Sequence, residues 1–278
     1  MSFSFKKILI PVDFTINTKV AIKKAIELAD AGTEIHLFYV QAGNIFERIL
    51  KTKSKYYNDS SHQQTRKKLL ELKQSIKEIS SDITVSFSIS ICNSIQKCIE
   101  EKITQLNFDL VIIGKNTRHS SLPFLNTVTP NEVAKNTGVT VLTAKPGSIH
   151  SSIRTMVVPI TTDITHFKEE IITTISRKFK VKIYLVTFGD ENQMNLHTSS
   201  LIRVYHWIKT SLRCQVEYTV LRGDNKAKAI LRYAEMLNAD ILLVNPKTET
   251  KISWLNNHIS DMLSPQSNLQ VLAVQSQS

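Results

Sequence analysis

Two stretches of strand-like sequence occur twice in this chain, and the repeat limits the possible folds. Ile8–Val12 is apolar and contains a proline, and Met156–Ile160 repeats the pattern with its proline 148 positions later. Asp109–Val111 likewise recurs as Asp240–Leu242, at an offset of 131. A chain of 278 residues commonly forms about two domains. We therefore predict two copies of one domain, the second 17 residues shorter between its second and fourth strands.

Short apolar runs alternate with segments of helical periodicity along the first copy. The predicted strands are residues 8–12, 35–40, 83–91, 109–114 and 139–144. The predicted helices are residues 20–29, ending near Gly32, then 62–79, 94–106 and 127–136, the last closed by Gly138. Such alternation indicates a parallel sheet with helices on both faces. Ligands of these sheets bind beyond the carboxyl ends of the strands, which places a site near Asp13 and Gly114.

The boundaries of the two copies follow from the repeat. We predict domains at residues 1–147 and 153–278, joined by a linker of about residues 146–152 that contains proline, glycine and serine. No apolar run approaches the roughly 18–20 residues of a membrane span, and the amino end lacks the layout of a signal peptide. These features predict a cytoplasmic protein with no membrane partner.

The cysteines and histidines give little support to a metal or redox site. Cys92, Cys98 and Cys214 are odd in number and form no C-x-x-C pair, which disfavours a disulfide framework or a zinc site. The eight histidines are scattered without metal-ligand spacing. No nucleophile-elbow, P-loop or dinucleotide motif occurs. The sequence therefore favours a protein that is not an enzyme or is at most a weak ATPase.

Positive charge is concentrated in residues 48–77, within a chain of net charge +11. This basic segment holds nine Lys and Arg side chains and two acidic ones, and it follows the second predicted strand. It could be a lid that contacts phosphates, a docking surface for an anionic partner, or only a solvated helix face, which is the commonest role of such runs. Tyr56 and Tyr57 could stack on bases, but no nucleic-acid-binding motif accompanies them, so nucleic acid is a minor alternative.

The order of these motifs resembles that of a tandem universal stress protein. The resemblance rests on Lys7–Phe14, Asp109–Gly114, Thr127-Val128, Val133-Ala134 and Val139–Leu142, and the two-copy arrangement extends it over nearly the whole chain. It implies two Rossmann-like domains of the adenine nucleotide alpha hydrolase-like type. Each would hold a five-stranded parallel sheet in the order 3-2-1-4-5. The resemblance also implies that the copies pair as an intramolecular pseudo-dimer, with a homodimer of chains left open.

Nucleotide-binding members of that family carry an acidic residue after strand one and the signature G-x2-G-x9-G-(S/T) after strand four. Glycines there let backbone N–H groups approach phosphates. Asp13, Gly114 and Thr127 match in the first copy, but Thr117 and Asn126 replace the other two glycines. The implied site for ATP, with Mg²⁺, consists of Pro11, Val12, Asp13, Val40, Gly114, Thr127 and Val128.

The second copy departs further from this signature. Thr161 stands in place of the aspartate, Asn245 in place of the first glycine, and His258 in place of the final hydroxyl residue. We therefore expect no nucleotide binding of the family's kind in the second copy.

Each matched residue also has a structural interpretation. Asp13 is equally suited to a helix N-cap or turn, Gly114 could relieve strain at a strand exit, and an N-cap role is favoured for Thr127. The leading hypothesis is a non-catalytic stress-response module that binds a protein partner or a small anionic ligand and keeps a degenerate nucleotide site. The alternatives are an ATP-binding switch with slow or no hydrolysis, and binding of an anionic partner through residues 48–77.

Overall fold

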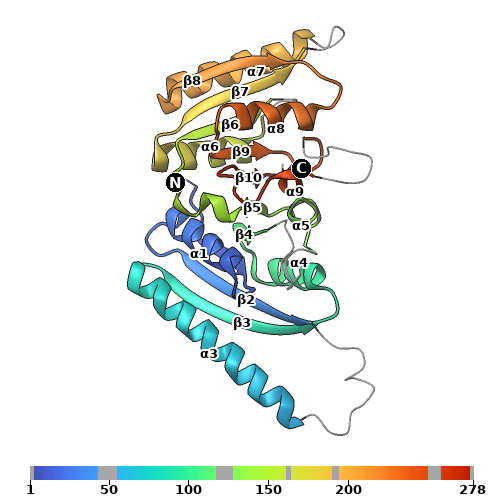
Figure 1. The fold of residues 1–278 in the computed structure, drawn as a ribbon. Coiled ribbons are helices and arrows are strands. Elements are labelled where there is room, and N and C mark those ends of the chain that lie inside the picture. Colours follow the sequence, from blue (N-terminus) through green and yellow to red (C-terminus); the bar gives the residue numbers. More distant parts are fainter. Residues whose placement is uncertain are drawn as a thin grey trace.

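Ten strands of the described chain form one continuous sheet with helices on both faces (Figure 1). The computed structural model describes residues 3–42, 55–116, 128–160, 164–189, 194–249 and 258–275. Two apolar cores flank the sheet, one beneath α1, α3, α6 and α7 and the other beneath α4, α5, α8 and α9. Within the described ranges, no helix combines the length and apolar character needed to cross a membrane.

The elements of the N-terminal half follow the predicted alternation. They are β1 (Lys7–Pro11), α1 (Ile16–Leu28), β2 (Glu34–Ala42), α3 (Lys55–Ile79), β3 (Thr84–Cys92), α4 (Ile95–Leu106), β4 (Leu110–Gly114), α5 (Pro130–Thr137) and β5 (Thr140–Ala144). Gly138 closes α5 at φ 74°, as predicted. The predicted end of the first helix near Gly32 was wrong, because α1 is capped at Ala29 and Gly32 lies in the following turn.

The C-terminal half repeats this succession with shorter elements. They are η1 (Pro146–His150), β6 (Thr155–Pro159), α6 (His166–Phe179), β7 (Lys182–Phe188), α7 (Met194–Trp207), η2 (Ile208–Leu212), β8 (Val216–Leu221), α8 (Lys226–Met236), β9 (Ile241–Val244), α9 (Ile259–Met262) and β10 (Gln270–Ala273). The 14 residues of α7 and the 5 of η2 stand where the N-terminal half has the 25-residue α3. This is where the offset of the sequence repeat changes.

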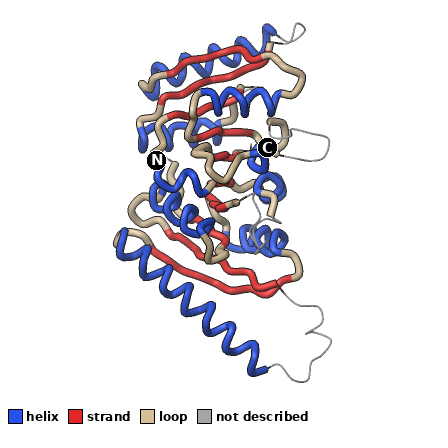
Figure 2. The backbone as a smooth tube through the Cα atoms, viewed as in Figure 1, coloured by secondary structure: helices blue, strands red, loops and turns tan. Residues whose placement is uncertain are grey.

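Strand order is mirrored about the centre of the sheet, as Figures 1 and 2 show. The order is β3-β2-β1-β4-β5 and then β10-β9-β6-β7-β8. β5 and β10 pair antiparallel, with Leu142 opposite Leu272, whereas the other neighbouring strands pair in parallel. The sheet is therefore mostly parallel, and its two sets of five strands are joined by backbone hydrogen bonds.

The repeated prolines lie where strand pairing ends. Pro11 is paired with Phe38 of β2, but the ladder between β1 and β4 stops at Leu9. Pro159 repeats this geometry between β7 and β9. Because proline has no N–H to donate, it is tolerated on the side of a strand that has no partner at that level. The prolines are therefore properties of the fold.

The repeated aspartates make the same backbone hydrogen bonds in the two halves, at the starts of β1 and β6. Asp109 Oδ2 accepts hydrogen bonds from the backbone N–H groups of Lys6 and Lys7, at 3.0 and 2.9 Å. Asp240 Oδ2 accepts from the corresponding N–H groups of Arg154 and Thr155, at 2.8 and 3.0 Å. The sequence repeat at Asp109 and Asp240 thus encodes the junction between β1 and β4, and between β6 and β9.

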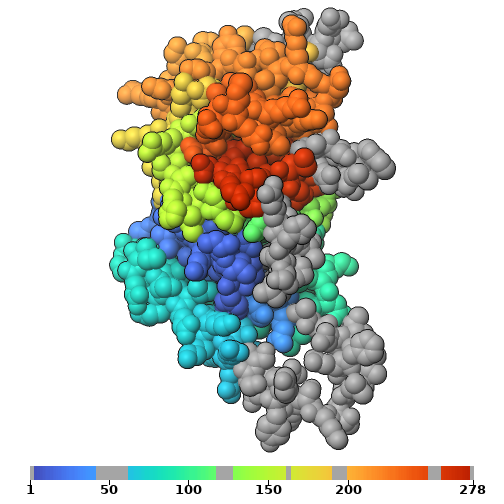
Figure 3. Space-filling model, viewed as in Figure 1, coloured from blue at the N-terminus to red at the C-terminus, as the bar shows by residue number. Residues whose placement is uncertain are grey.

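Contacts across the centre join the two halves, which occupy opposite ends of the space-filling view (Figure 3). Lys24 Nζ is fully buried and donates to Ser151 O at 2.8 Å, just after the 3₁₀ helix η1. Lys178 Nζ bonds Asp30 Oδ1 at 2.8 Å and also contacts Ala29 O. The predicted linker region is therefore packed against α1.

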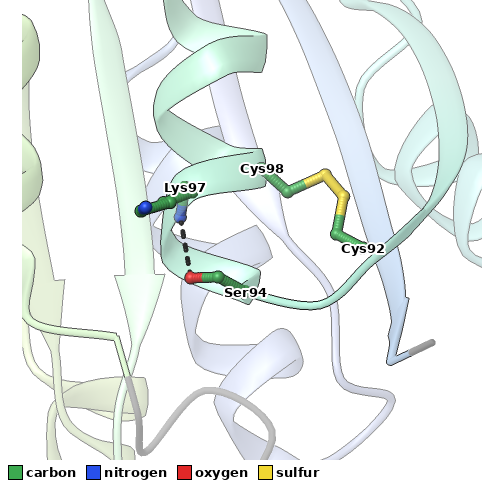
Figure 4. The surroundings of a disulfide bond; sticks show 4 residues. All are labelled: Cys92, Ser94, Lys97 and Cys98. Atoms are coloured by element: carbon green, nitrogen blue, oxygen red, sulfur yellow. Dashed lines mark hydrogen bonds between the residues drawn. A yellow bond between two sulfur atoms is a disulfide. The ribbon is translucent and has the colours of Figure 1, made fainter. Parts of the chain in front are cut away.

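Cys92 and Cys98 form a disulfide that joins the end of β3 to the first turn of α4 (Figure 4). The expectation that these cysteines form no disulfide was wrong for this pair. The turn that leads into the Ser94 N-cap brings their Cα atoms to 6.3 Å, within disulfide reach. Cys214 is the free cysteine. The odd count conceals this arrangement, because it shows neither which cysteines pair nor which one is left over.

The buried imidazole of His36 predicts a loss of stability in acid. Its ring nitrogens lie 2.8 Å from the hydroxyls of Ser86 and Ser88, and burial, with the nearby Lys102, lowers its pKa to about 4 against the raising effect of Glu34. Between pH 6.5 and 4 the unfolded chain binds a proton at this site that the folded chain does not. Stability from this group is therefore present above pH 6.5 and is lost as the pH falls toward 4.

The expected size of this loss is up to about 3 kcal/mol, and it is measured by urea unfolding at several pH values. His36→Gln keeps an amide that donates and accepts but does not titrate, so its stability should fall less over the same interval. Equal slopes for the two proteins would contradict the assignment.

Candidate binding site at the carboxyl edge of the sheet

The sequence-predicted site residues lie together at one edge of the N-terminal half. Pro11 ends β1 and Gly114 ends β4, while Val12, Val40 and Val128 are fully buried in the two cores beside them. The backbone N–H of Val12 continues the β1–β2 ladder by donating to Phe38 O. Thr127 lies outside the described residues, as do Thr117 and Asn126 of the signature. The edge is therefore formed mainly by apolar residues, and Asp13 contributes its half-buried carboxylate.

The Asp13 carboxylate is occupied by its own turn. Its Oδ1 accepts from the N–H of Thr15 at 2.9 Å and from the hydroxyls of Thr15 and Thr18 at 2.7 and 2.8 Å. Its Oδ2 accepts from Asn17 Nδ2 at 2.9 Å. Thr15 is the N-cap of α1, so these contacts fix the start of the helix. The geometry matches the turn role that the sequence left open for Asp13, whereas the N-cap of α1 is Thr15.

Gly114 is required by close packing between β4 and α1. A Cβ built on Gly114 would lie 2.0 Å from the backbone oxygen of Asn17 and 2.5 Å from its carbonyl carbon. No side chain fits that space, since the obstacle is backbone in the first turn of a helix. Backbone atoms of Asn17 occupy the space in which a side chain at position 114 would lie. This packing explains the glycine without any need for a bound phosphate.

Two buried lysines beside Gly114 were not singled out by the sequence patterns. Lys115 Nζ donates to Val128 O at 2.9 Å and to Asp261 Oδ1 of α9 at 2.7 Å. Lys145 is fully buried, and its Nζ has no hydrogen-bond partner among the described atoms. Burial and the charge of Lys115 lower the pKa of Lys145 to about 8, against the raising effect of Asp261. The sequence contained a signal for these two lysines, because each directly follows a predicted buried strand, β4 or β5.

The matching edge of the C-terminal half contains a buried ion pair. Asn245, in place of the first signature glycine, donates its N–H to Glu249 Oε2 at 2.8 Å. Glu249 is 2% exposed and lies 3.6 Å from Lys168 Nζ, which also donates to Pro159 O at 3.1 Å. Thr161 lies outside the described residues. The backbone N–H at the first signature position is therefore bonded within the protein, to a carboxylate that is itself paired with Lys168.

The basic segment reaches the edge through α3. Residues 48–54 lie outside the described residues. Beyond them, Leu69 and Ile76 of α3 are buried, and Arg66, Lys67 and Lys68 are exposed. Lys68 Nζ lies 5.4 Å from the centre of the Phe14 ring, directly after Asp13. One cation of the segment is therefore close to the candidate site.

A mostly parallel sheet that is covered by helices on both faces defines a Rossmann-like α/β protein. The sequence profile of the universal stress protein family matches residues 4–145, about half of the chain. The chain belongs to that family. No curated protein matches the chain.

Solved structures share the fold at low sequence identity. A universal stress protein from Archaeoglobus fulgidus is 15% identical, with 98% of this chain and 99% of that chain covered and a TM-score of 0.68. A functionally unknown protein from Pseudomonas aeruginosa is 14% identical, with coverage of 98% and 92% and a TM-score of 0.60. The cytoplasmic domain of a prokaryotic cation chloride cotransporter is 12% identical, with coverage of 98% and 95% and a TM-score of 0.54. At these identities the likeness concerns the fold alone.

Proposed function

We propose that this universal stress protein is a cytoplasmic, non-catalytic regulatory binding module built from two copies of one domain. The copies are residues 1–147 and 153–278, joined by residues 146–152. The mirrored strand order and the matched Asp109 and Asp240 contacts support the duplication. The antiparallel β5–β10 pairing and the Lys115–Asp261 contact support an intramolecular pseudo-dimer. Such a module acts by binding a protein partner or a small anionic ligand.

The nucleotide site of the N-terminal copy is degenerate in this proposal. The observation that carries it is the closed hydrogen-bond set of the Asp13 carboxylate, which leaves the acidic residue committed to the start of α1. The space at Gly114 is also taken by Asn17. A nucleotide that used the Asp13 carboxylate would have to compete with these hydrogen bonds.

Thermal unfolding with and without nucleotide tests this proposal. We expect any midpoint shift caused by millimolar Mg-ATP, ADP or AMP to be the same within about 1 °C in the unaltered protein and in Asp13→Ala, since saturation of a site that uses Asp13 to 100 times Kd would add about 5 °C or more. The comparison uses the shift relative to each variant's own ligand-free midpoint, because Asp13→Ala also removes helix-capping contacts. An ATP shift that Asp13→Ala abolishes, but that Lys228→Gln on the far helix α8 retains, would favour the ATP-binding switch instead.

A further inference from the structure

A basic cavity lies at the amino edge of the C-terminal half, opposite the edge that holds the candidate site. Its volume is about 680 Å³, within the range of small-molecule sites. It opens where β6, β7 and β8 begin and where α6 and η2 end. The five charged side chains that line it are all cationic: Arg154, Arg177, Lys180, Lys182 and Arg213.

The fold does not require this excess of positive charge, because the equivalent positions of the N-terminal half do not carry it. Strand register gives the equivalent positions, since Thr155 pairs with Lys182 as Lys7 pairs with Glu34. The equivalent pairs are Arg154 and Lys6, Lys182 and Glu34, and Arg213 and Asp82. The three positions carry a net charge of +3 in the C-terminal half and −1 in the N-terminal half. A requirement of the sheet itself would apply to both halves.

Helix dipoles do not account for the charges either. Cations at a helix C-terminus offset its partial negative charge, and Arg177 lies in the last turn of α6. The corresponding helix α1 ends at the same kind of edge with no basic residue in its last turn. Among the described residues, Arg177, Lys180 and Arg213 form no ion pair, whereas Lys182 Nζ lies 2.7 Å from Glu217 Oε1. Several cations of the cavity therefore have no opposite charge to neutralise them.

A buried hydroxyl in the same cavity also lacks a partner. Ser176 lines the cavity from α6 and is 2% exposed. Its Oγ makes no hydrogen bond in the described structure. A helical serine commonly bonds the carbonyl one turn earlier, so an unsatisfied buried hydroxyl is costly unless a ligand completes it. Ser176 therefore places a buried hydroxyl without a partner next to a cationic cavity.

We propose that this cavity binds a small anion with two or more phosphate groups. Within the described part of the chain, four of the five cations around this hollow form no ion pair, which is more charge than a single phosphate needs, and guanidinium groups hold phosphate oxygens in pairs. The Ser176 hydroxyl supplies the hydrogen bond at the buried end. The site lies across the sheet from Asp13 and Gly114, so it is independent of the nucleotide question at the carboxyl edge.

Cys214 provides a direct readout, because this free thiol also lines the cavity. Inorganic tripolyphosphate is the probe, and peptide mapping follows alkylation of Cys214 by iodoacetamide at constant ionic strength. We expect bound tripolyphosphate to slow alkylation at least fivefold and calorimetry to give the same Kd. Unchanged alkylation together with no calorimetric binding would overturn the proposal.

A pair of double variants separates a built site from general attraction of anions. Arg177→Gln with Arg213→Asn removes two cavity cations, and asparagine tolerates the positive φ of 53° at position 213. Lys228→Gln with Arg232→Gln removes the same charge from exposed positions on α8. We expect the first pair to weaken tripolyphosphate binding about tenfold or more and the control pair less than twofold. Equal losses would overturn the proposal.

Ser176→Ala tests the buried end of the cavity. Ligand affinity should fall about threefold to tenfold, while the ligand-free midpoint should stay the same or rise because an unsatisfied hydroxyl is removed. A hydroxyl with only a structural role would leave affinity unchanged, and that result would remove Ser176 from the site.

Parallel titrations with ATP and AMP distinguish free oligophosphate from the phosphate chain of a nucleotide. ATP binding that is lost in the Arg177 and Arg213 variant and retained in Asp13→Ala assigns the nucleotide to this cavity. ATP binding with the reverse pattern belongs to the carboxyl edge, and the tripolyphosphate result then decides the cavity proposal alone.

Discussion

Replacement of Gly114 by alanine is expected to lower the free energy of unfolding by about 3 kcal/mol or more. The added methyl group would lie 2.0 Å from Asn17 O. Neither can move alone, because the methyl group is fixed to the backbone of β4 and the oxygen belongs to the backbone of α1. Relief requires α1 to move away from β4, which would strain the Asp13 cap and the core beneath Ala21. Urea unfolding at pH 7, with the midpoint and slope both recorded, measures the loss.

Gly32 and Gly147 provide the matched controls. A Cβ on Gly32 meets nothing within 4 Å, and its φ of 82° alone should cost about 1 kcal/mol in Gly32→Ala. A Cβ on Gly147 would lie 2.1 Å from Gln266 O, so Gly147→Ala should behave like Gly114→Ala. A Gly114→Ala protein no less stable than Gly32→Ala would show that α1 can shift freely and would reopen the phosphate interpretation of Gly114.

The predictable part of the fold is the part encoded by local patterns. The β4 run at Leu110–Gly114 is continuously apolar because the strand is buried on both faces. The aspartate before it recurs as Asp240 because each aspartate holds the start of a neighbouring strand by hydrogen bonds. Pro11 is tolerated at the end of a central strand because β1 has no β4 partner at that level. Periodicity, turn residues and the repeat together therefore predict the elements and their alternation.

The remaining features depend on contacts that no local pattern records. An aspartate directly after β1 fits a nucleotide site and a turn equally well, so only the hydrogen bonds from Thr15 and Asn17 distinguish the two roles of Asp13. The Cys92–Cys98 disulfide depends on the turn between two elements. The charges of the basic cavity come from three separate stretches of the chain, whereas a count of charge along the sequence pointed to residues 48–77.

The second large effect is expected at Asp261, the carboxylate that faces two buried lysines. Asp261→Ala should lower the free energy of unfolding by about 3 kcal/mol at pH 7. Among the described residues, the change leaves Lys115 Nζ with Val128 O as its one hydrogen-bond partner, and it removes the carboxylate that raises the pKa of Lys145. Since these residues join β4 and β5 to α9, the loss weakens the contact between the two halves.

The pH dependence of the Asp261→Ala effect identifies its cause. The folded-state pKa of Lys145 lies near 8, below the unfolded value of about 10.4, so stability rises with pH between these values. Without Asp261 the penalty for the charged form is larger, and the difference between variant and wild type should shrink from pH 7 to pH 9.5. Glu217→Ala, which breaks the more exposed pair with Lys182, should cost less than about 1 kcal/mol.

Lys145→Met completes the test, because it removes the unpartnered charge and retains most of the side-chain volume. Combined with Asp261→Ala, it should recover a large share of the lost stability, since one of the two buried lysines no longer needs a carboxylate. If the two changes instead add independently, Asp261 stabilises the protein through the Lys115 contact alone. If Asp261→Ala costs no more than Glu217→Ala, the buried lysines are not electrostatically coupled to α9.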